Sequence, residues 1–191
     1  MELIFATHNK GKLKEVQGLV PEGIKVISLD DLNMTTEIEE TGTTLQENAL
    51  IKARYLYKEY KKPVLADDTG LEVHALGGAP GVYSARYAGT HGDAEKNMTL
   101  LLKNMESLED RKARFRTVMA HIDSEGKETL FEGIVEGVIS KVRQGAEGFG
   151  YDPIFQPEGN ALSFAQMSLA EKNLVSHRAR ALKKFIEFIN M

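Results

Sequence analysis

The 191-residue sequence contains no cysteine and no tryptophan. The lack of cysteine excludes disulfides, thiolate zinc sites, iron–sulfur clusters and a cysteine nucleophile. No apolar run approaches the ~18 residues that cross a bilayer. The first residues also lack the basic segment and apolar stretch of an export signal. We therefore expect a cytoplasmic protein that does not associate with a membrane.

The sequence also lacks an excess of basic residues, with 24 Lys and Arg against 28 Asp and Glu. A general nucleic-acid-binding protein usually carries a basic excess, so we expect no nucleic-acid partner. Hydrophobic residues make up 42% of the chain and charged residues 27%, values that exclude a broadly disordered protein. The length fits a single domain over residues 1–191.

The predicted elements begin with a strand, a helix and a second strand, which favours an α/β fold. Residues 2–6 form an apolar strand, and Asn9 caps a helix that starts near Lys10. Thr44 and Glu47 form a capping box before a long helix that ends before Pro63. Further elements are a helix at 94–105, a hairpin of strands at 113–123 and 129–139, and two helices after Ser168 and Ser176.

The first candidate site is the turn from Thr7 to Lys12, between the first strand and its helix. Backbone N–H groups at a helix N-terminus suit phosphate oxygens, and hydroxyl, amide and ammonium groups add further donors. The spacing of a P-loop is absent. A plain N-capped helix with a solvated lysine face is the alternative interpretation.

The second candidate is Asp67-Asp68, which follows a short predicted strand over residues 64–66. Ligands of α/β sheets tend to bind at the carboxyl ends of strands. Two crowded carboxylates would raise each other's pKa, and Mg²⁺ would relieve the repulsion. An Asp-rich turn before Gly70 is the alternative. Glu39 and Glu40 would support a metal role only if they face these aspartates.

Two further segments are candidates for ligand contacts. In Gly148–Pro153, glycines flank Phe149, which can stack on a base, and Asp152 can accept hydrogen bonds from ring N–H groups. His177 and Arg178 open the last predicted helix, where the helix dipole disfavours cations. They therefore suggest a nearby anion or polar ligand, although a surface pair remains the alternative.

Taken together, the segments resemble the inosine triphosphate pyrophosphatase family, the Ham1/RdgB-like non-canonical purine nucleotide pyrophosphatases. The resemblance spans nearly the whole chain. The motifs that carry it are Thr7-x-Asn9-x-x-Lys12, Glu40-Thr41-Gly42-x-Thr44-Leu45-x-x-Asn48-Ala49-x-x-Lys52-Ala53, Ala66-Asp67-Asp68-Thr69-Gly70-Leu71, Gly77–Tyr87, Gly148–Pro153, Lys172 and Ser176-His177-Arg178.

This resemblance implies an elongated, two-lobed α/β domain around a long bent mixed sheet with a central groove. It also implies a homodimer that hydrolyses ITP, dITP and XTP to the monophosphate and pyrophosphate with Mg²⁺, removing deaminated purines from the nucleotide pool.

The resemblance also implies roles for individual residues. Asp68, Lys52 and Asp67 are implied to be catalytic, and Glu40 and Asp68 to bind the metal, with Asp68 as the expected general base. The implied substrate contacts are Thr7, His8, Asn9, Lys10, Gly11, Lys12, Thr69, Phe149, Gly150, Tyr151, Asp152, Lys172, His177 and Arg178.

Two alternative functions remain open at this point. A Maf-type house-cleaning pyrophosphatase would act on pyrimidine or modified nucleotides, but the Gly148–Pro153 loop and Ser176-His177-Arg178 favour purines. A non-catalytic nucleotide-binding module is the other alternative. The cluster of carboxylates argues against it, because their mutual repulsion costs stability without an ion.

Overall fold

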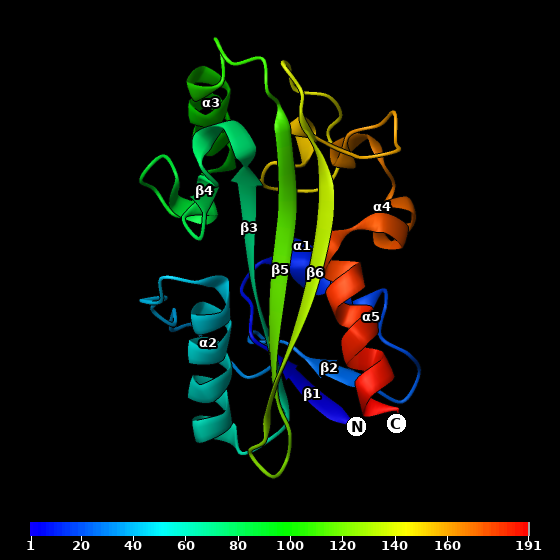
Figure 1. Ribbon diagram of the computed structural model, residues 1–191. Coiled ribbons are helices and arrows are strands. Elements are labelled where there is room, and N and C mark those ends of the chain that lie inside the picture. Colours follow the sequence, from blue (N-terminus) through cyan, green and yellow to red (C-terminus); the bar gives the residue numbers. More distant parts are fainter. Residues whose placement is uncertain (191) are drawn as a thin grey trace. The chain divides into compact units, whose positions relative to one another are not determined.

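A computed structural model describes residues 1–190 (Figure 1). The chain divides into two compact units. The first unit comprises Met1–Asp68, Thr117–Gly133 and the described residues from Arg178 onward, and the second comprises Thr69–Arg116 and Ile134–His177. The helices and strands are β1 (Glu2–Phe5), α1 (Lys10–Gln17), β2 (Lys25–Ile27), α2 (Leu45–Tyr60), β3 (Val64–Val73), β4 (Pro80–Gly81), α3 (Ala94–Asn104), β5 (Lys112–Ile122), β6 (Glu128–Ile139), β7 (Phe155–Pro157), α4 (Leu169–Val175) and α5 (His177–Ile189).

The strands form a seven-stranded mixed sheet in the order β2-β1-β3-β5-β6-β7, with β4 beside β3. β1 runs parallel to β2 and β3, whereas β4 is antiparallel to β3 and β7 is antiparallel to β6. The mixed α/β fold predicted from the sequence is therefore confirmed. β3, β5 and β6 contribute residues to both units.

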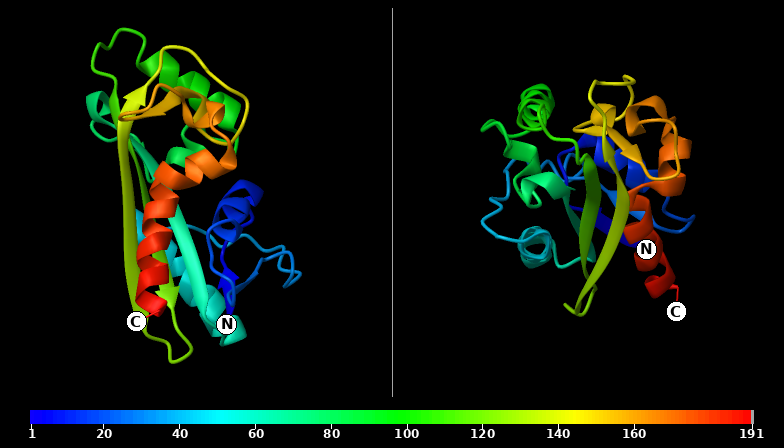
Figure 2. Two further views of the ribbon diagram at one scale, coloured as in Figure 1. Left: turned by 90° about the vertical axis from the view of Figure 1, so that its right-hand side faces the viewer. Right: turned by 45° about the horizontal axis from the view of Figure 1, so that its top comes forward.

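In the first unit, helices cover both faces of the sheet (Figures 1 and 2). α2 lies on one face, and its Leu45, Ala49, Ala53 and Leu56 are buried. α1 and α5 share a hydrophobic core with the sheet on the other face. This core contains Leu3, Phe5, Val16, Leu65, Met119, Phe131, Ala181, Leu182 and Phe185.

The second unit has a separate hydrophobic core. It is built from β3, β5, β6, α3 and the segment from Tyr151 to Met167, and three of its phenylalanines pack together. The ring centroids of Phe115 and Phe155 lie 4.7 Å apart, and those of Phe155 and Phe164 lie 5.2 Å apart. This core supports the loop that contains Phe149 and Asp152.

The helix starts agree with the predicted caps. The side chain of Asn9 accepts hydrogen bonds from the backbone N–H groups of Gly11 and Lys12, and Thr44 forms the expected capping box with Glu47. α2 ends at Tyr60, and the next residue, Lys61, has the left-handed backbone conformation and lies two residues before Pro63. Within residues 1–190, no helix combines the length and apolar character that membrane crossing requires.

One predicted boundary is wrong. The strand that was expected to end at Ala66 continues as β3 to Val73, so Asp67 and Asp68 lie inside a ten-residue strand rather than after it. Asp and Gly have low strand propensity and are common in turns, which hid the continuity of the strand. Pairing with β1 at Leu65 and with β4 at Leu71 holds the segment extended.

Candidate functional site

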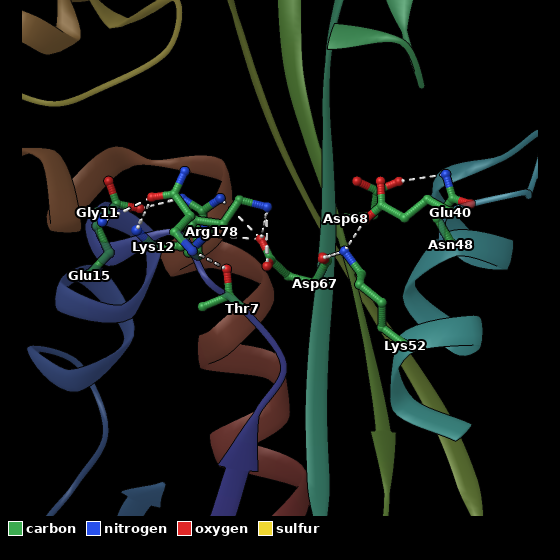
Figure 3. Close-up of polar contacts among 11 residues, drawn as sticks. Thr7, Gly11, Lys12, Glu15, Glu40, Asn48, Lys52, Asp67, Asp68 and Arg178 are labelled. Carbon is green, nitrogen blue, oxygen red and sulfur yellow. Dashed lines mark hydrogen bonds and ion pairs between the residues drawn. The ribbon is translucent and has the colours of Figure 1, made fainter. Parts of the chain in front are cut away.

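The position of Asp67 and Asp68 within β3 determines where their side chains point. Successive side chains of a strand project to opposite faces of the sheet. Asp67 accordingly faces α1 and α5, and Asp68 faces α2 (Figure 3). The two aspartates therefore have separate environments.

Asp67 is completely buried and forms ion pairs with two cationic side chains. Its Oδ2 lies 3.1 Å from Nζ of Lys12 on α1, and 3.0 Å from Nη2 of Arg178 on α5. Arg178 is also buried and forms a second ion pair with Glu15 of α1. Burial disfavours the charge of Asp67, but Lys12 and Arg178 together bring its pKa far below the usual range.

The predicted phosphate turn lies beside this network. Thr7 Oγ1 accepts a hydrogen bond from the N–H of Asn9 at 3.1 Å, and Asn9 Oδ1 caps α1. Burial lowers the pKa of Lys12, although Asp67 opposes this effect. His8 and Lys10 are exposed and Gly11 is partly exposed, so the turn presents side-chain donors to solvent.

Asp68 has a different set of neighbours. Its Oδ2 accepts a hydrogen bond from Nδ2 of Asn48 at 3.1 Å. Burial, together with the charge of Glu40, raises the pKa of Asp68 even though Lys52 acts in the opposite direction. From the sequence, the two adjacent carboxylates are expected to raise each other's pKa. Asp68 has a raised pKa, with Glu40 among its causes, but the expectation is wrong for Asp67, because Lys12 and Arg178 lower its pKa.

Lys52 connects the surroundings of the two aspartates. Its Nζ lies 2.5 Å from Oε1 of Glu40 and 2.6 Å from the backbone carbonyl oxygen of Asp67. Burial alone would lower the pKa of Lys52, but Asp68 and Glu40 raise it, so Lys52 stays charged.

Glu40 and Asp68 form the candidate metal site. Carboxylate oxygens are the ligands that Mg²⁺ prefers, and Mg²⁺ is commonly held by one or two carboxylates with waters and substrate phosphates completing its shell. This pair fits that pattern. No group of three or more His, Cys, Asp or Glu side chains with metal-binding geometry occurs among residues 1–190.

The second unit holds Phe149, Asp152, Lys172 and His177 of the residues expected to contact the purine, whereas Arg178 lies in the first unit. Nζ of Lys172 lies 2.5 Å from Oδ2 of Asp152 and 4.6 Å from the ring centroid of Phe149. Asp152 Oδ2 also accepts a hydrogen bond from the N–H of Phe149 at 2.9 Å. A buried ammonium, a buried carboxylate and an aromatic ring thus form one compact cluster.

The remaining expected residues are placed as follows. Tyr151 is buried and donates to the carbonyl oxygen of Ser84 at 2.7 Å, and burial raises its pKa. The imidazole of His177 stacks on Phe115 with 4.5 Å between ring centroids. Gly150 has φ +61°, which glycine adopts without strain. Thr69 follows Asp68 in β3 and is partly buried.

The structure therefore sorts the predicted residues into two groups. The first unit contains Thr7, His8, Asn9, Lys10, Gly11, Lys12, Glu40, Lys52, Asp67, Asp68 and Arg178, and the second contains Thr69, Phe149, Gly150, Tyr151, Asp152, Lys172 and His177. The roles of these residues stay predictions.

Two residues that contact the first group carried no predicted role. Glu15 is buried against Arg178, and Asn48 is buried against Asp68. Asn48 does lie within a motif of the resemblance, at a fixed spacing from Glu40 and Lys52. For Glu15, the only available signal was its position three residues after Lys12 on the same helix face.

Comparison with known proteins identifies relatives over nearly the whole chain. The model of the Ham1 family matches residues 3–188. Relatives named dITP/XTP pyrophosphatase include one from Christiangramia forsetii, 50% identical over the whole of both chains, and one from Bacillus licheniformis, 51% identical over 96% of this chain and 95% of the relative.

Solved structures show the same fold. The Ham1 protein of Staphylococcus aureus is 38% identical with a TM-score of 0.88, covering 100% of this chain and 98% of that one. The nucleoside-triphosphatase of Mycobacterium abscessus, also titled dITP/XTP pyrophosphatase, is 41% identical with a TM-score of 0.77, covering 97% and 99%. The chain belongs to the Ham1 family.

Proposed function

We propose that this protein is a dITP/XTP pyrophosphatase, which converts ITP, dITP and XTP to the nucleoside monophosphate and pyrophosphate. The observation that carries the proposal is the buried carboxylate of Asp68, held beside Glu40 and Lys52 with a raised pKa. Relatives that bear this name match over their full length at about half identity, which supports the proposal.

The first unit supplies the groups that bind phosphate. A nucleoside triphosphate carries about four negative charges at neutral pH, which cations must offset. Lys12 and Lys52 provide two positive charges, and the N-terminus of α1 adds the positive end of its helix dipole. Thr7 and Asn9 fix the conformation of this turn by accepting the N–H groups of Asn9, Gly11 and Lys12.

Glu40 and Asp68 would hold Mg²⁺, which when bound offsets phosphate charge and polarises the phosphoryl group under attack. Asp68 takes a proton from the attacking water as general base, a contribution of roughly 10²–10⁴-fold to the rate. Lys52 holds the Glu40 carboxylate at 2.5 Å, and it also anchors to the backbone of β3.

The second unit supplies the groups that select the base. Phe149 stacks on the purine, while Lys172 and Asp152 contact its polar edge. Hypoxanthine and xanthine carry an oxygen at position 6, whereas adenine carries an amino group there. A buried donor that faces an amino group stays unpaired, which costs roughly 1–3 kcal/mol per site. Donors such as Lys172 and His177 thereby favour the oxo bases.

The proposal is tested with a panel of nucleotides. The purified protein is incubated with ITP, XTP, GTP, ATP and dTTP, with and without Mg²⁺, and pyrophosphate and monophosphate are quantified. We expect Mg²⁺-dependent pyrophosphate release from ITP and XTP, with little from ATP, whose base lacks the 6-oxo group, and little from GTP, as the resemblance to non-canonical purine pyrophosphatases implies. Turnover of dTTP alone would indicate a Maf-type enzyme, and ITP binding without turnover would indicate a binding module. Orthophosphate as first product would contradict the assigned bond.

We also propose that the enzyme works as a homodimer, which the resemblance supports.

A further inference from the structure

We infer that Asn48 is a positioning residue that sets the affinity of the Glu40–Asp68 pair for a divalent cation. The inference rests on the proposed metal-dependent function. It assigns to Asn48 a role that depends on its contacts with Asp68 and with the segment that follows Glu40.

The side-chain amide of Asn48 links two elements of the candidate metal site. Asn48 is fully buried in the first turns of α2. Its Nδ2 donates to Oδ2 of Asp68 at 3.1 Å, and its Oδ1 accepts the backbone N–H of Gly42 at 2.8 Å. Gly42 lies two residues after Glu40, so one amide joins the carboxylate on β3 to the segment that carries the other carboxylate (Figure 3).

The pattern of one donor and one acceptor in this link fits the side chain of asparagine. A carboxylate accepts and a backbone N–H donates, so the bridging group must donate on one side and accept on the other. An aspartate would place a second charge beside Asp68 and could not donate when ionised. An aliphatic side chain would leave the N–H of Gly42 without this partner. The contacts also fix which amide atom is nitrogen and which is oxygen.

The neighbouring glycine shows how closely the segment approaches Asn48. A Cβ at Gly42 would lie 2.7 Å from Oδ1 of Asn48 and 2.6 Å from Cβ of Glu47, closer than real Cβ contacts allow. The next residues are held by Glu47, whose Oε2 accepts the N–H groups of Thr43 at 2.7 Å and Thr44 at 3.2 Å. The segment after Glu40 is therefore fastened to the start of α2.

Groups that orient metal ligands without touching the metal commonly change metal affinity 10–100-fold when they are removed. We therefore expect Asn48→Ala to weaken binding of Mn²⁺, a paramagnetic stand-in for Mg²⁺, by roughly 10–100-fold. Binding is measured by electron paramagnetic resonance of free Mn²⁺ with protein alone, without nucleotide. The Mg²⁺ concentration for half-maximal ITP hydrolysis should rise in parallel.

The chain provides a matched control in Asn97. This residue is also buried four positions after a helix N-cap, and its amide also links its helix to a neighbouring loop, accepting from the N–H of Ala88 at 2.8 Å and donating to the carbonyl of Ala85 at 3.2 Å. These partners are backbone groups only. Asn97→Ala should reduce thermal stability as Asn48→Ala does, but leave Mn²⁺ affinity unchanged.

Gly42→Ala provides a second route to the same measurement if Asn48→Ala does not fold. It keeps the amide and displaces the segment, so Mn²⁺ affinity should again fall. Unchanged Mn²⁺ affinity in a folded Asn48→Ala or Gly42→Ala protein would overturn the inference, as would an equal loss in Asn97→Ala. An inactive wild-type enzyme would refute the proposed function, whereas the Mn²⁺ comparison does not depend on turnover.

Discussion

At the scale of single residues, Asp67 and Asp68 are adjacent in sequence but have different physical roles. Asp67 is ionised and holds Lys12 and Arg178, so its charge contributes to stability. Asp68 has a raised pKa, so its carboxylate is a stronger base than that of an ordinary aspartate. Substitutions at the two positions should therefore have separable effects.

Asp68→Asn should abolish most turnover while the protein stays folded. The loss of the general base should lower pyrophosphate release from ITP by at least about 10²-fold. Because the folded-state pKa of Asp68 lies above its unfolded value, ionising this group costs stability as the pH rises, and the neutral amide avoids that cost. The measurements are pyrophosphate release and thermal unfolding. Normal activity would contradict the assigned role.

Asp67→Asn is the matched comparison, and its effect should depend on pH. It leaves Lys12 and Arg178 without their carboxylate, and breaking such a buried pair costs roughly 3–5 kcal/mol. The folded-state pKa of Asp67 lies below its unfolded value of about 3.9. Its stabilising contribution is therefore present above that pH and lost as the pH falls. Urea unfolding of wild type and variant without metal should show a difference at pH 7 that shrinks below about pH 4. A difference that stays constant would be inconsistent with this assignment.

Lys172→Met should weaken discrimination between bases. The ammonium contacts both Asp152 and Phe149, and methionine keeps the length of the side chain without the charge. The ratio of kcat/KM for ITP to that for ATP should fall by about tenfold, the equivalent of one hydrogen bond to a charged group. Because both substrates are measured on the same protein, a smaller fraction of folded enzyme lowers both values of kcat/KM equally and leaves their ratio unchanged. An unchanged ratio would remove Lys172 from base recognition.

At the scale of elements, the sequence predicted local features better than distant contacts. The caps of α1 and α2 depend on residues within four positions of one another, and Asn9 and Thr44 act as expected. The pairing of Arg178 with Asp67 joins residues 111 positions apart, and no local pattern encodes such a contact. The same reason explains why the continuity of β3 was missed.

Gly70 tests the continuity of β3 at this scale. A Cβ at this position would lie 2.6 Å from the carbonyl oxygen of Gly81, because β4 packs closely against β3. Gly70→Ala should therefore destabilise the protein by roughly 1–3 kcal/mol, as overpacking does. Glu72→Ala on the same strand loses only partly exposed ion pairs and should cost no more than about 1 kcal/mol. Equal thermal stability of the glycine variant and wild type would contradict the close approach.

At the scale of the whole molecule, the sequence predicted the mixed α/β fold and the family, because motifs spread over nearly the whole chain carry both. Each of the two units has its own hydrophobic core, and the predicted phosphate and base contacts fall in different units. That division did not follow from residue patterns, because each unit combines segments that are distant in the sequence.

The proposed homodimer is tested by light scattering coupled to size exclusion. We expect a particle of twice the chain mass of 21.2 kDa at micromolar concentration. A particle of the single-chain mass at every accessible concentration would contradict the proposal. The measurement is made on the same preparation that hydrolyses ITP, so that the assembly state refers to active protein.

The alternation of side chains along β3 has one more consequence. The strand separates two sets of contacts, with the ion pairs of Asp67 to Lys12 and Arg178 on one side and the hydrogen bond of Asp68 to Asn48 on the other. Substitutions in α2 and its preceding loop can therefore change the acid strength of Asp68 while the ion pairs among α1, α5 and β3 stay intact.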